Sequence, residues 1–252
     1  NVICNGGNNG SITFNINGGI MDYEINIAGV NQNLAAGLTS FTTPSNLSAG
    51  SYPYTVSDAN GCLFIDTAYV LESIAISLVE NTTSVSCFGG VDGSIDLSIS
   101  GGTGSFNFMW STADTTEDIS NLSIGTYTYT ITDSLNCIFS DTVSITEPSP
   151  INVSISTTNV SCANGNDGTA ILNISGGVFP YTENWGLSSS LNLDANNHTF
   201  IVTDDNGCNY SDSITISDPP SLLVSYITTD ALCNGALDGT ATLTISGGVN
   251  PY

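Results

Sequence analysis

The chain has 252 residues, of which 23 are acidic, one is a histidine and none is Lys or Arg, so its formal net charge at pH 7 is −23. Ordinary soluble domains mix both signs of charge. The absence of cations excludes nucleic-acid binding, which needs Lys and Arg to displace phosphate counterions, and it also excludes attraction to anionic membranes. No run approaches the ~18 apolar residues of a membrane-spanning helix, so no direct membrane insertion is expected in this segment.

Two motifs recur along the chain. CFGGVDGSIDLSISGG at 87–102 has relatives at 4–19, 162–177 and 233–248, and NLSIGTYTYTITD at 121–133 has relatives at 46–58 and 192–204, each shortly before another cysteine. These repeats predict independent domains. The expected boundaries are 1–72 (repeat 1, first strand missing), 73–147 (repeat 2), 148–218 (repeat 3) and 219–252 (repeat 4, truncated). Because the chain begins and ends inside a repeat, we expect a longer protein, with further repeats of the same chain as its neighbours.

Apolar and polar residues alternate within each repeat, the pattern of half-buried strands. A strand before the first cysteine of a repeat is represented by Ile151, Val153 and Ile155. The inward positions expected after that cysteine in repeat 2 are, in chain order, Ile95, Leu97 and Ile99, then Trp110 on a central strand, then Tyr127, Tyr129 and Ile131, and finally Phe139, Asp141, Val143 and Ile145. The equivalents of the first set in repeat 4 are Ala241, Leu243 and Ile245. Such short strands predict an all-β fold of tandem immunoglobulin-like or PKD-like antiparallel β-sandwich domains arranged as a rod.

The repeats resemble the SprB repeat of Bacteroidetes cell-surface proteins. The resemblance rests on C-x-G-G-x-D-G-S-I, on S-G-G followed by P-Y and W, on N-L-S-x-G-T-Y-x-Y-T-I-T-D-x-x-x-C and on S-I-T-E-P, and it covers the whole chain. It implies a non-enzymatic, extracellular adhesin or surface filament, exported by type IX secretion and serving surface attachment or gliding. The partners it implies are surface glycans or abiotic surfaces, with self-association into fibres. Repeat 1 departs from the pattern because it has no Trp.

The alternative function is a carbohydrate-binding array that presents aromatic side chains to glycans. Burial or exposure of Trp110 and Trp185 distinguishes the two functions, since core anchors are buried and sugar platforms are exposed. No catalytic residue is expected, because the carboxylates repeat in every unit like scaffolding. His198 takes the position of Tyr52 and Tyr127 and is expected in a core or corner role.

Cysteines are the strongest site candidates. The disulfide candidates are Cys4, Cys62, Cys87, Cys137, Cys162, Cys208 and Cys233. They contain no CxxC pair, so they fit neither a zinc site nor, with one histidine, a Cys-His nucleophile. Pairing within a repeat would join Cys4–Cys62, Cys87–Cys137 and Cys162–Cys208. Pairing across a joint would join Cys62–Cys87, Cys137–Cys162 and Cys208–Cys233. We expect the pairing within a repeat ahead of the pairing across a joint and ahead of unpaired or intermolecular cysteines. Both pairings face an objection, because the first turn and the last hairpin of an immunoglobulin-like domain lie at opposite ends.

Acidic residues also recur in register. Turn chemistry explains them, since Asp accepts hydrogen bonds from its own turn and Gly follows where φ is positive. No cofactor is required, but Ca²⁺ held by carboxylates and carbonyls is the alternative. Its candidate ligands are Asp92, Asp167, Asp238, Glu147 and Asp218.

Asp-Thr/Ser-hydrophobic triplets recur on the last strand of each repeat. They resemble the O-glycosylation sequon of Bacteroidetes and make Thr67, Thr142 and Ser213 candidate acceptors on the outward face. A Thr-rich solvent face would produce such triplets without any modification.

Overall fold

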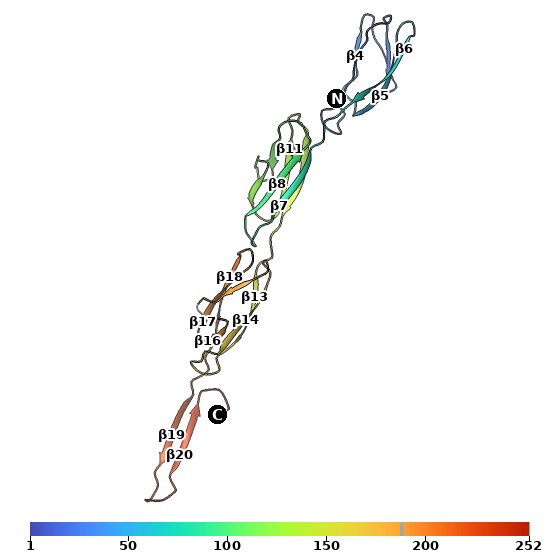
Figure 1. Cartoon of the computed structure of the whole chain (residues 1–252). Coiled ribbons are helices and arrows are strands. Elements are labelled where there is room, and N and C mark those ends of the chain that lie inside the picture. Colours follow the sequence, from blue (N-terminus) through green and yellow to red (C-terminus); the bar gives the residue numbers. More distant parts are fainter. Residues whose placement is uncertain (187–188, 252) are drawn as a thin grey trace. The chain divides into compact units, whose positions relative to one another are not determined.

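The structure is a computed structural model that describes residues 1–186 and 189–251 (Figure 1). Its strands fall into successive groups, which we name the first bead (β1–β6), the second bead (β7–β12), the third bead (β13–β18) and the end hairpin (β19 and β20). The chain divides into two compact units, Asn1–Thr83 with Gly93–Ile145, and Ser84–Asp92 with the residues from Thr146 onward. The loop between β7 and β8 therefore belongs to the second unit. The described residues include no helix with the length and hydrophobicity needed to span a membrane.

The second bead is a sandwich of two antiparallel three-stranded sheets. Its strands are β7 (Ser77–Thr83), β8 (Gly93–Ser100), β9 (Asn107–Trp110), β10 (Ile119–Leu122), β11 (Gly125–Thr132) and β12 (Ile138–Ile145). The strand orders are β10-β8-β7 and β12-β11-β9. Ile95 and Leu97 of one sheet are buried, as are Tyr129 and Ile131 of the other, so period-two alternation is confirmed at these positions. The inward position expected for Asp141 is wrong, because this side chain is exposed. The central strand predicted for Trp110 is wrong, because Trp110 ends β9, which lies at the edge of its sheet.

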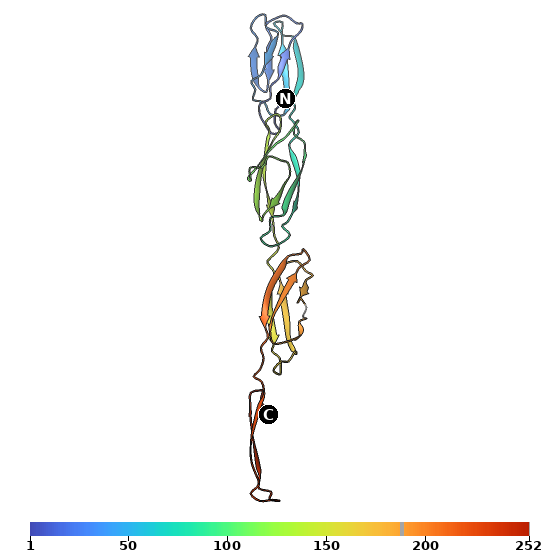
Figure 2. The ribbon, with the colours of Figure 1, turned by 90° about the vertical axis from the view of Figure 1, so that its left-hand side faces the viewer.

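The third bead, yellow to orange in Figure 2, repeats this arrangement of two three-stranded sheets. They are β13 (Asn152–Thr158), β14 (Gly168–Ser175), β15 (Thr182–Asn184), β16 (Leu191–Leu193), β17 (Asn197–Thr203) and β18 (Asn209–Thr215). The sheets have the orders β13-β14-β16 and β15-β17-β18. Trp185, Leu193, Phe200 and Val202 belong to its buried core.

The first bead differs on one side. Its strands are β1 (Thr13–Asn15), β2 (Glu24–Ile27), β3 (Val30–Asn33), β4 (Ser40–Thr42), β5 (Gly50–Ser57) and β6 (Leu63–Val70). They form a four-stranded sheet, β3-β2-β5-β6, and a two-stranded sheet, β1-β4. Within the part of the chain that the structure describes, β1 has no partner equivalent to β7 or β13.

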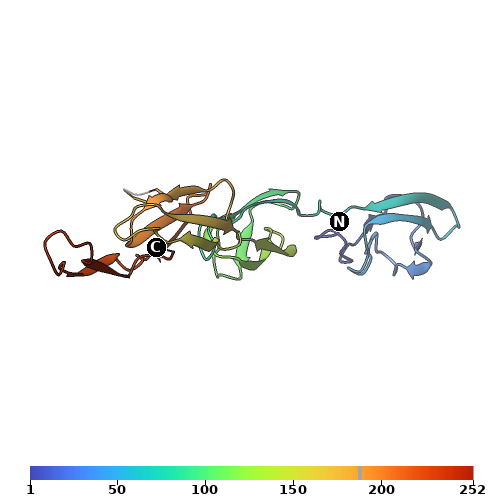
Figure 3. The same ribbon diagram turned by 90° about the horizontal axis from the view of Figure 1, so that it is seen from below.

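The end hairpin consists of β19 (Leu223–Thr229) and β20 (Thr240–Ser246) (Figures 1 and 3). Every residue of both strands is exposed. The burial expected for Ala241, Leu243 and Ile245 is therefore wrong, because an apolar face is buried only when a second sheet covers it, and the described residues supply none here.

The same corner recurs in all three beads. The Tyr127 hydroxyl donates to the Ser123 carbonyl at 2.8 Å, and the Tyr52 hydroxyl donates to the Ser48 carbonyl at 2.9 Å. The His198 Nε2 makes the same bond to the Asp194 carbonyl at 2.9 Å. A tyrosine that bonds back to the chain a few residues upstream is a hallmark of immunoglobulin-like sandwiches. The corner role expected for His198 is confirmed.

Candidate functional site

The candidate site comprises the two kinds of cysteine-bearing turn that the disulfides join between beads, Cys4 to Cys137 and Cys87 to Cys208. We call Cys4, Cys87, Cys162 and Cys233 the opening cysteines, and residues 4–10, 87–93, 162–168 and 233–239 the opening loops. We call Cys62, Cys137 and Cys208 the closing cysteines. Each kind of cysteine sits in a preformed turn that the repeat motifs build.

The aspartate of the DG pair closes the opening loop. In the second bead, the Asp92 Oδ1 accepts the Ser86 N–H at 3.0 Å, and the Ser86 hydroxyl donates to the other oxygen of the same carboxylate. These two bonds hold the pKa of Asp92 below its usual value, because they stabilise the charged form. The other loops use the same bond, from Ile3 to Asn9 (2.9 Å), from Ser161 to Asp167 (2.9 Å) and from Leu232 to Asp238 (3.2 Å).

The glycine of the DG pair serves a purpose that the sequence did not show. Gly93 does not have a positive φ; the residue that does is Gly89, at +72°. A Cβ at Gly93 would lie 2.8 Å from the Ile145 Cγ2 and 2.9 Å from the Leu122 carbonyl oxygen. Positive φ is therefore the wrong explanation for this glycine, which is needed because the core and a neighbouring strand approach too closely for a side chain.

The acidic residue at each joint holds the opening loop of its own repeat. The Glu147 Oε2 accepts the Gly89 N–H at 2.7 Å. Glu72 accepts from Gly6 at 2.6 Å, and Asp218 from Asn164 at 3.1 Å. The joint is thereby fixed to the loop that carries the opening cysteine.

All five calcium candidates thus accept a backbone N–H. They are Asp92, Asp167, Asp238, Glu147 and Asp218. Within residues 1–186 and 189–251, no three His, Cys, Asp or Glu side chains gather as a metal site would require. The calcium site remains a prediction without a cluster to carry it.

A second aspartate builds each closing turn. The Asp133 Oδ1 accepts the N–H groups of Leu135 and Cys137, both at 2.9 Å, and its Oδ2 accepts the Thr103 N–H at 3.0 Å. Asp204 and Asp58 make the equivalent bonds to Cys208 and Cys62 at 2.9 Å. This carboxylate therefore ties the turn after the S-G-G sequence to the closing cysteine and fixes the direction of its backbone.

The disulfides join opening to closing cysteines of successive beads. Cys4 bonds to Cys137, with 5.4 Å between Cα atoms, and Cys87 bonds to Cys208, with 5.6 Å. Both distances fit the usual range for a disulfide. The two pairings expected from the sequence, within a repeat and across a joint, are both wrong.

Strand geometry explains why pairing within a repeat fails. Cys137 immediately precedes β12, whose other end, Ile145, packs beside Gly93 at the end of the opening loop. An eight-residue strand is about 26 Å long at 3.3 Å per residue, far beyond the reach of a disulfide. Pairing of Cys62 with Cys87 fails for a related reason, since β6 and β7 both lie between them and carry the chain away from Cys62.

Three cysteines are free and exposed: Cys62, Cys162 and Cys233. One is a closing cysteine and two are opening cysteines. The signal for the true pairing was available in the tandem order, because opening and closing cysteines at opposite ends of every repeat bring each opening cysteine to the closing cysteine of the next repeat.

The glycosylation candidates occupy one position on β6, β12 and β18. Thr142 and Ser213 are exposed, and Thr67 is half-buried. In each case the backbone N–H donates to the carboxylate of the preceding Asp, at 2.7–2.8 Å. The outward position expected from alternation suits an attached sugar at Thr142 and Ser213.

Both tryptophans are core anchors. Trp110 is 2% exposed and Trp185 is 8% exposed. Their indole N–H groups donate to the Thr116 carbonyl at 2.9 Å and to the Glu183 carboxylate at 3.2 Å. The prediction of core anchors is confirmed, and an exposed tryptophan platform for sugars is wrong.

Paired antiparallel sheets, tyrosine-type corners and cysteine staples define a tandem array of immunoglobulin-like domains, a class common in surface proteins. The SprB repeat model matches residues 1–29, 79–115, 154–185 and 225–252, which make up half of the chain. The chain belongs to the SprB repeat family, and the resemblance drawn from its motifs is confirmed.

Several solved structures are similar at low identity. An amphioxus IgVJ-C2 molecule is 18% identical over 56% of this chain and 98% of its own, with a TM-score of 0.25. The Dpr2 Ig1-Ig2 structure in complex with DIP-Theta Ig1-Ig3 is 9% identical over 85% and 96%, with a TM-score of 0.28. Domains 7, 8 and 9 of the S-layer protein SbsC are 11% identical over 77% and 79%, with a TM-score of 0.22. No curated protein matches the sequence.

Proposed function

We propose that this chain is a segment of the stalk or filament of an extracellular cell-surface adhesin that mediates surface attachment or gliding and is exported by type IX secretion. Its proposed building units are the repeats 1–72, 73–147, 148–218 and 219–252. The observation that carries the proposal is the pair of disulfides that staple one bead to the next, Cys4–Cys137 and Cys87–Cys208. A chain that must transmit tension benefits from covalent links across its joints.

The two staples overlap in sequence, which limits how far the chain can extend. Cys87 lies inside the loop closed by Cys4–Cys137, and Cys137 lies inside the loop closed by Cys87–Cys208. When every strand unfolds, the shortest covalent path from Cys4 to Cys208 crosses one disulfide to Cys137, runs back along the chain to Cys87 and crosses the other disulfide. That path spans about 190 Å, compared with about 700 Å for the reduced chain, at ~3.5 Å per extended residue.

Single-molecule force spectroscopy tests this mechanical role. The chain is held at its two ends and stretched with and without a reducing agent. We expect the extension gained on complete unfolding to rise by about 500 Å when the disulfides are reduced, the difference between the two path lengths. Equal extension in both conditions would remove the mechanical basis of the proposal.

Antibodies raised against this chain test the cellular role. Immunogold labelling of the cells that produce it should mark the outer surface, and Fab fragments should reduce their attachment or gliding, with preimmune Fab as the control. Labelling confined to the cell interior would contradict the adhesin function.

The non-enzymatic nature of the segment is supported by its carboxylates. Asp133 and Asp204 are buried, and both oxygens of each accept backbone N–H groups. Carboxylates that serve as structural acceptors in every bead are unsuited to the paired acid and base roles of a glycosidase. The carbohydrate-binding alternative loses Trp110 and Trp185 to the core, so surface attachment is preferred.

We also propose O-glycosylation at Thr67, Thr142 and Ser213, supported by their common strand position. Peptide mass spectrometry of the native protein should find added sugar, most completely at the exposed Thr142 and Ser213. Ser134 is the matched control: it follows Asp133, but its hydroxyl donates to the Thr103 carbonyl at 2.6 Å. Equal modification of Ser134, or bare Thr142 and Ser213, would contradict the assignment.

A further inference from the structure

A pocket of about 240 Å³ lies beside the Cys87–Cys208 disulfide, and we call it the staple pocket. All of its lining residues belong to the second compact unit. Its walls come chiefly from three segments: the opening loop at Cys87 and Phe88, the joint segment 148–151 before β13, and the start of β18 after Cys208. Two successive repeats therefore each supply part of one pocket.

These walls are fixed before any ligand arrives. The disulfide holds the opening loop to the closing turn, and beside it the Asn206 Nδ2 donates to the Ser86 carbonyl at 2.9 Å. The joint segment is held by the Gly177 N–H, which donates to the Ser149 carbonyl at 2.8 Å. Walls that need no ordering lower the entropic cost of binding.

Aromatic and proline side chains make up the apolar part of the lining. Phe88 is 58% exposed, so its ring is open to a ligand. Tyr210 is half-buried, and its hydroxyl donates to the Asp212 carboxylate at 3.2 Å. Pro148 and Pro150 add apolar surface, and each fixes a φ angle of the joint segment.

A few polar groups accompany this apolar surface. The Asn209 Oδ1 accepts the Thr203 hydroxyl at 2.6 Å, which leaves the Asn209 amide nitrogen as a donor. Ser149 is exposed and adds a hydroxyl that can donate or accept. The buried Asp204 carboxylate takes no part, because both of its oxygens accept backbone N–H groups. An apolar recess with a small number of polar groups is the usual composition of a small-molecule site.

This composition fits a neutral sugar ring. A pyranose has a face of C–H groups that packs on aromatic rings, and hydroxyls at its edge that bond to amides and hydroxyls. The volume of the staple pocket lies below the ~300–1,000 Å³ of sites for drug-sized ligands, so it suits a single ring. Acidic sugars are disfavoured, because the chain has a net charge of −23 and no Lys or Arg to pair with them.

We propose that the staple pocket binds one pyranose residue of a neutral glycan, with its C–H face on Phe88 and Tyr210 and its hydroxyls bonded to Asn209 and Ser149. Neither tryptophan takes part, since both lie in the core. The inference rests on the proposed adhesin and specifies the chemical class of its ligand.

The Cys4–Cys137 staple borders an equivalent pocket with different walls, of about 160 Å³. Asn5 stands where the second staple has Phe88, and Ser73 and Ala75 replace the two prolines. This pocket lacks the exposed ring and the rigid joint segment, so we expect one sugar per chain.

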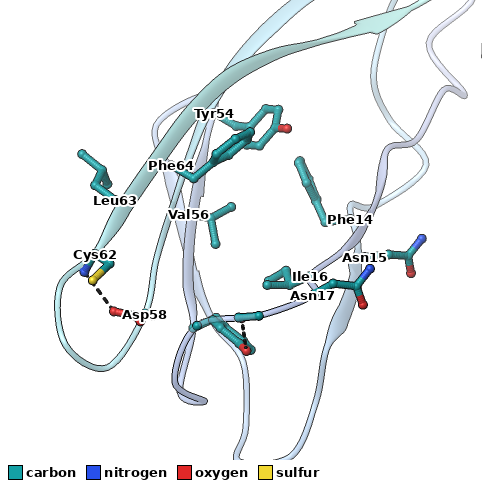
Figure 4. A pocket seen from close by; sticks show the side chains of 13 residues that line it. Phe14, Asn15, Ile16, Asn17, Tyr54, Val56, Asp58, Cys62, Leu63 and Phe64 are labelled. Atoms are coloured by element: carbon teal, nitrogen blue, oxygen red, sulfur yellow. Dashed lines mark hydrogen bonds between the residues drawn. The ribbon is translucent and has the colours of Figure 1, made fainter.

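The pocket beside the closing turn of the first bead is of another kind (Figure 4). It measures about 360 Å³, and its walls include Phe14 of the hydrophobic core and Tyr54, which packs against that core. Leu63 takes the position of Asn209, so a sugar ring would meet a hydrocarbon side chain where the staple pocket offers an amide.

Saturation-transfer NMR on the whole chain tests the ligand class. The probes are the methyl glycosides of glucose, galactose, mannose, fucose and N-acetylglucosamine. We expect at least one of them to bind, and methyl glucuronide to bind more weakly than methyl glucoside. Cyclohexanol is the control for a merely apolar pocket, because it has a six-membered ring with one hydroxyl. Absence of binding by all five glycosides, or equal binding by cyclohexanol, would overturn the proposal.

Substitution of the exposed ring tests the position of the site. Phe88→Ala should weaken binding about tenfold through loss of the aromatic contact, whereas Phe88→Trp should retain it. Phe64→Ala is the matched control, because Phe64 is 57% exposed and lines the pocket of the first bead instead (Figure 4). Equal loss in the two alanine variants, or loss in neither, would overturn the assignment to the staple pocket.

Opening each staple in turn tests whether two repeats must be joined. Cys208→Ser should weaken sugar binding, because it releases the opening loop that carries Phe88, whereas Cys4→Ser opens the other staple and should leave binding unchanged. Equal binding by these two variants would contradict a wall supplied by the opening loop. These readouts are independent of the force and labelling experiments: a chain that binds no sugar but marks the cell surface would lose this ligand and keep the proposed stalk.

Discussion

The first and second beads carry the same motifs, but among the described residues the first bead has an additional strand, β3, and no counterpart of β7. In the second bead, β7 covers the edge of β8, and Glu80 on β7 accepts the hydroxyl of Tyr129. Tyr129 is 2% exposed there, whereas its equivalent in the first bead, Tyr54, is half-buried beside the open pocket. One strand thus supplies both the cover for the core and the polar partner of its central tyrosine.

The difference shows which parts of the motif are encoded independently of the strand. The glycine pair Gly18 and Gly19, equivalent to Gly101 and Gly102, keeps its positive φ in the first bead, and the closing turn and the corner keep their hydrogen bonds there. These hydrogen bonds are made within the bead, so the turns form without a counterpart of β7.

Gly101 and its equivalent Gly18 give the largest expected difference between the two beads. Gly101→Ala places a Cβ 1.9 Å from the Ala75 carbonyl oxygen at a φ of +73°, and it should reduce the free energy of unfolding of the second bead by about 3–4 kcal/mol, from overpacking and backbone strain together. Gly18→Ala carries the strain alone, about 1–2 kcal/mol.

Hydrogen-exchange mass spectrometry in denaturant resolves the beads and measures both values. Equal losses at the two positions would mean that the close approach of Ala75 to Gly101 adds nothing to the backbone strain. In a Trp185→Phe background, Trp110 fluorescence gives an independent reading of the second bead.

The staples give the next largest difference. Cys137→Ser removes a link whose loop spans 133 residues, and the second bead should lose about 2–4 kcal/mol of unfolding free energy. Cys62→Ser removes an exposed free thiol and should change stability by less than about 0.5 kcal/mol.

Cys4→Ser is the control for the staple, because it breaks the same bond from the other side. It should match Cys137→Ser, and the double variant should lose little more. A second, independent loss in the double variant would mean that the cysteines act separately.

The sequence predicted what depends on local alternation and missed what depends on the next bead. Period two located Ile95, Ile131 and the other inward residues because a pleated strand with one buried face imposes that pattern. The corner was found because His198 aligned with two tyrosines. The partner of Cys4 was missed because Cys137 lies in another bead. A motif within one repeat gives no information on the distance between cysteines of different beads. The reason for Gly93 was missed because close approach is a tertiary property.

Acid should loosen the two opening loops differently. The Ser86 hydroxyl and N–H hold the pKa of Asp92 below its usual value, so this carboxylate stabilises the fold above the unfolded pKa of about 3.9. The contribution is lost as the pH falls through the lower folded pKa, since protonation removes the charged acceptor. The first bead has Asn9 in this position, and its bond to the Ile3 N–H does not titrate.

Hydrogen exchange between pH 5 and pH 2, corrected for intrinsic rates, should show loss of protection at the Ser86 amide before the Ile3 amide. Asp92→Asn should remove this difference, because the amide oxygen still accepts the bond. If both loops opened at the same pH, the shared joint acids Glu72 and Glu147 would control the loops instead.

Calcium gives the smallest expected effect. Chelation with EDTA should leave the melting temperature of every bead unchanged. The carboxylates of Asp92, Asp167 and Glu147 already accept hydrogen bonds from backbone N–H groups, which stabilise their charge without a metal ion. The first bead is an internal control, since Asn9 gives its loop one carboxylate fewer than the loop that contains Asp92. If calcium stabilised the second and third beads but not the first, the metal would be assigned to the DG aspartates. If calcium stabilised all three beads, it would be assigned to the joint acids, which every bead shares.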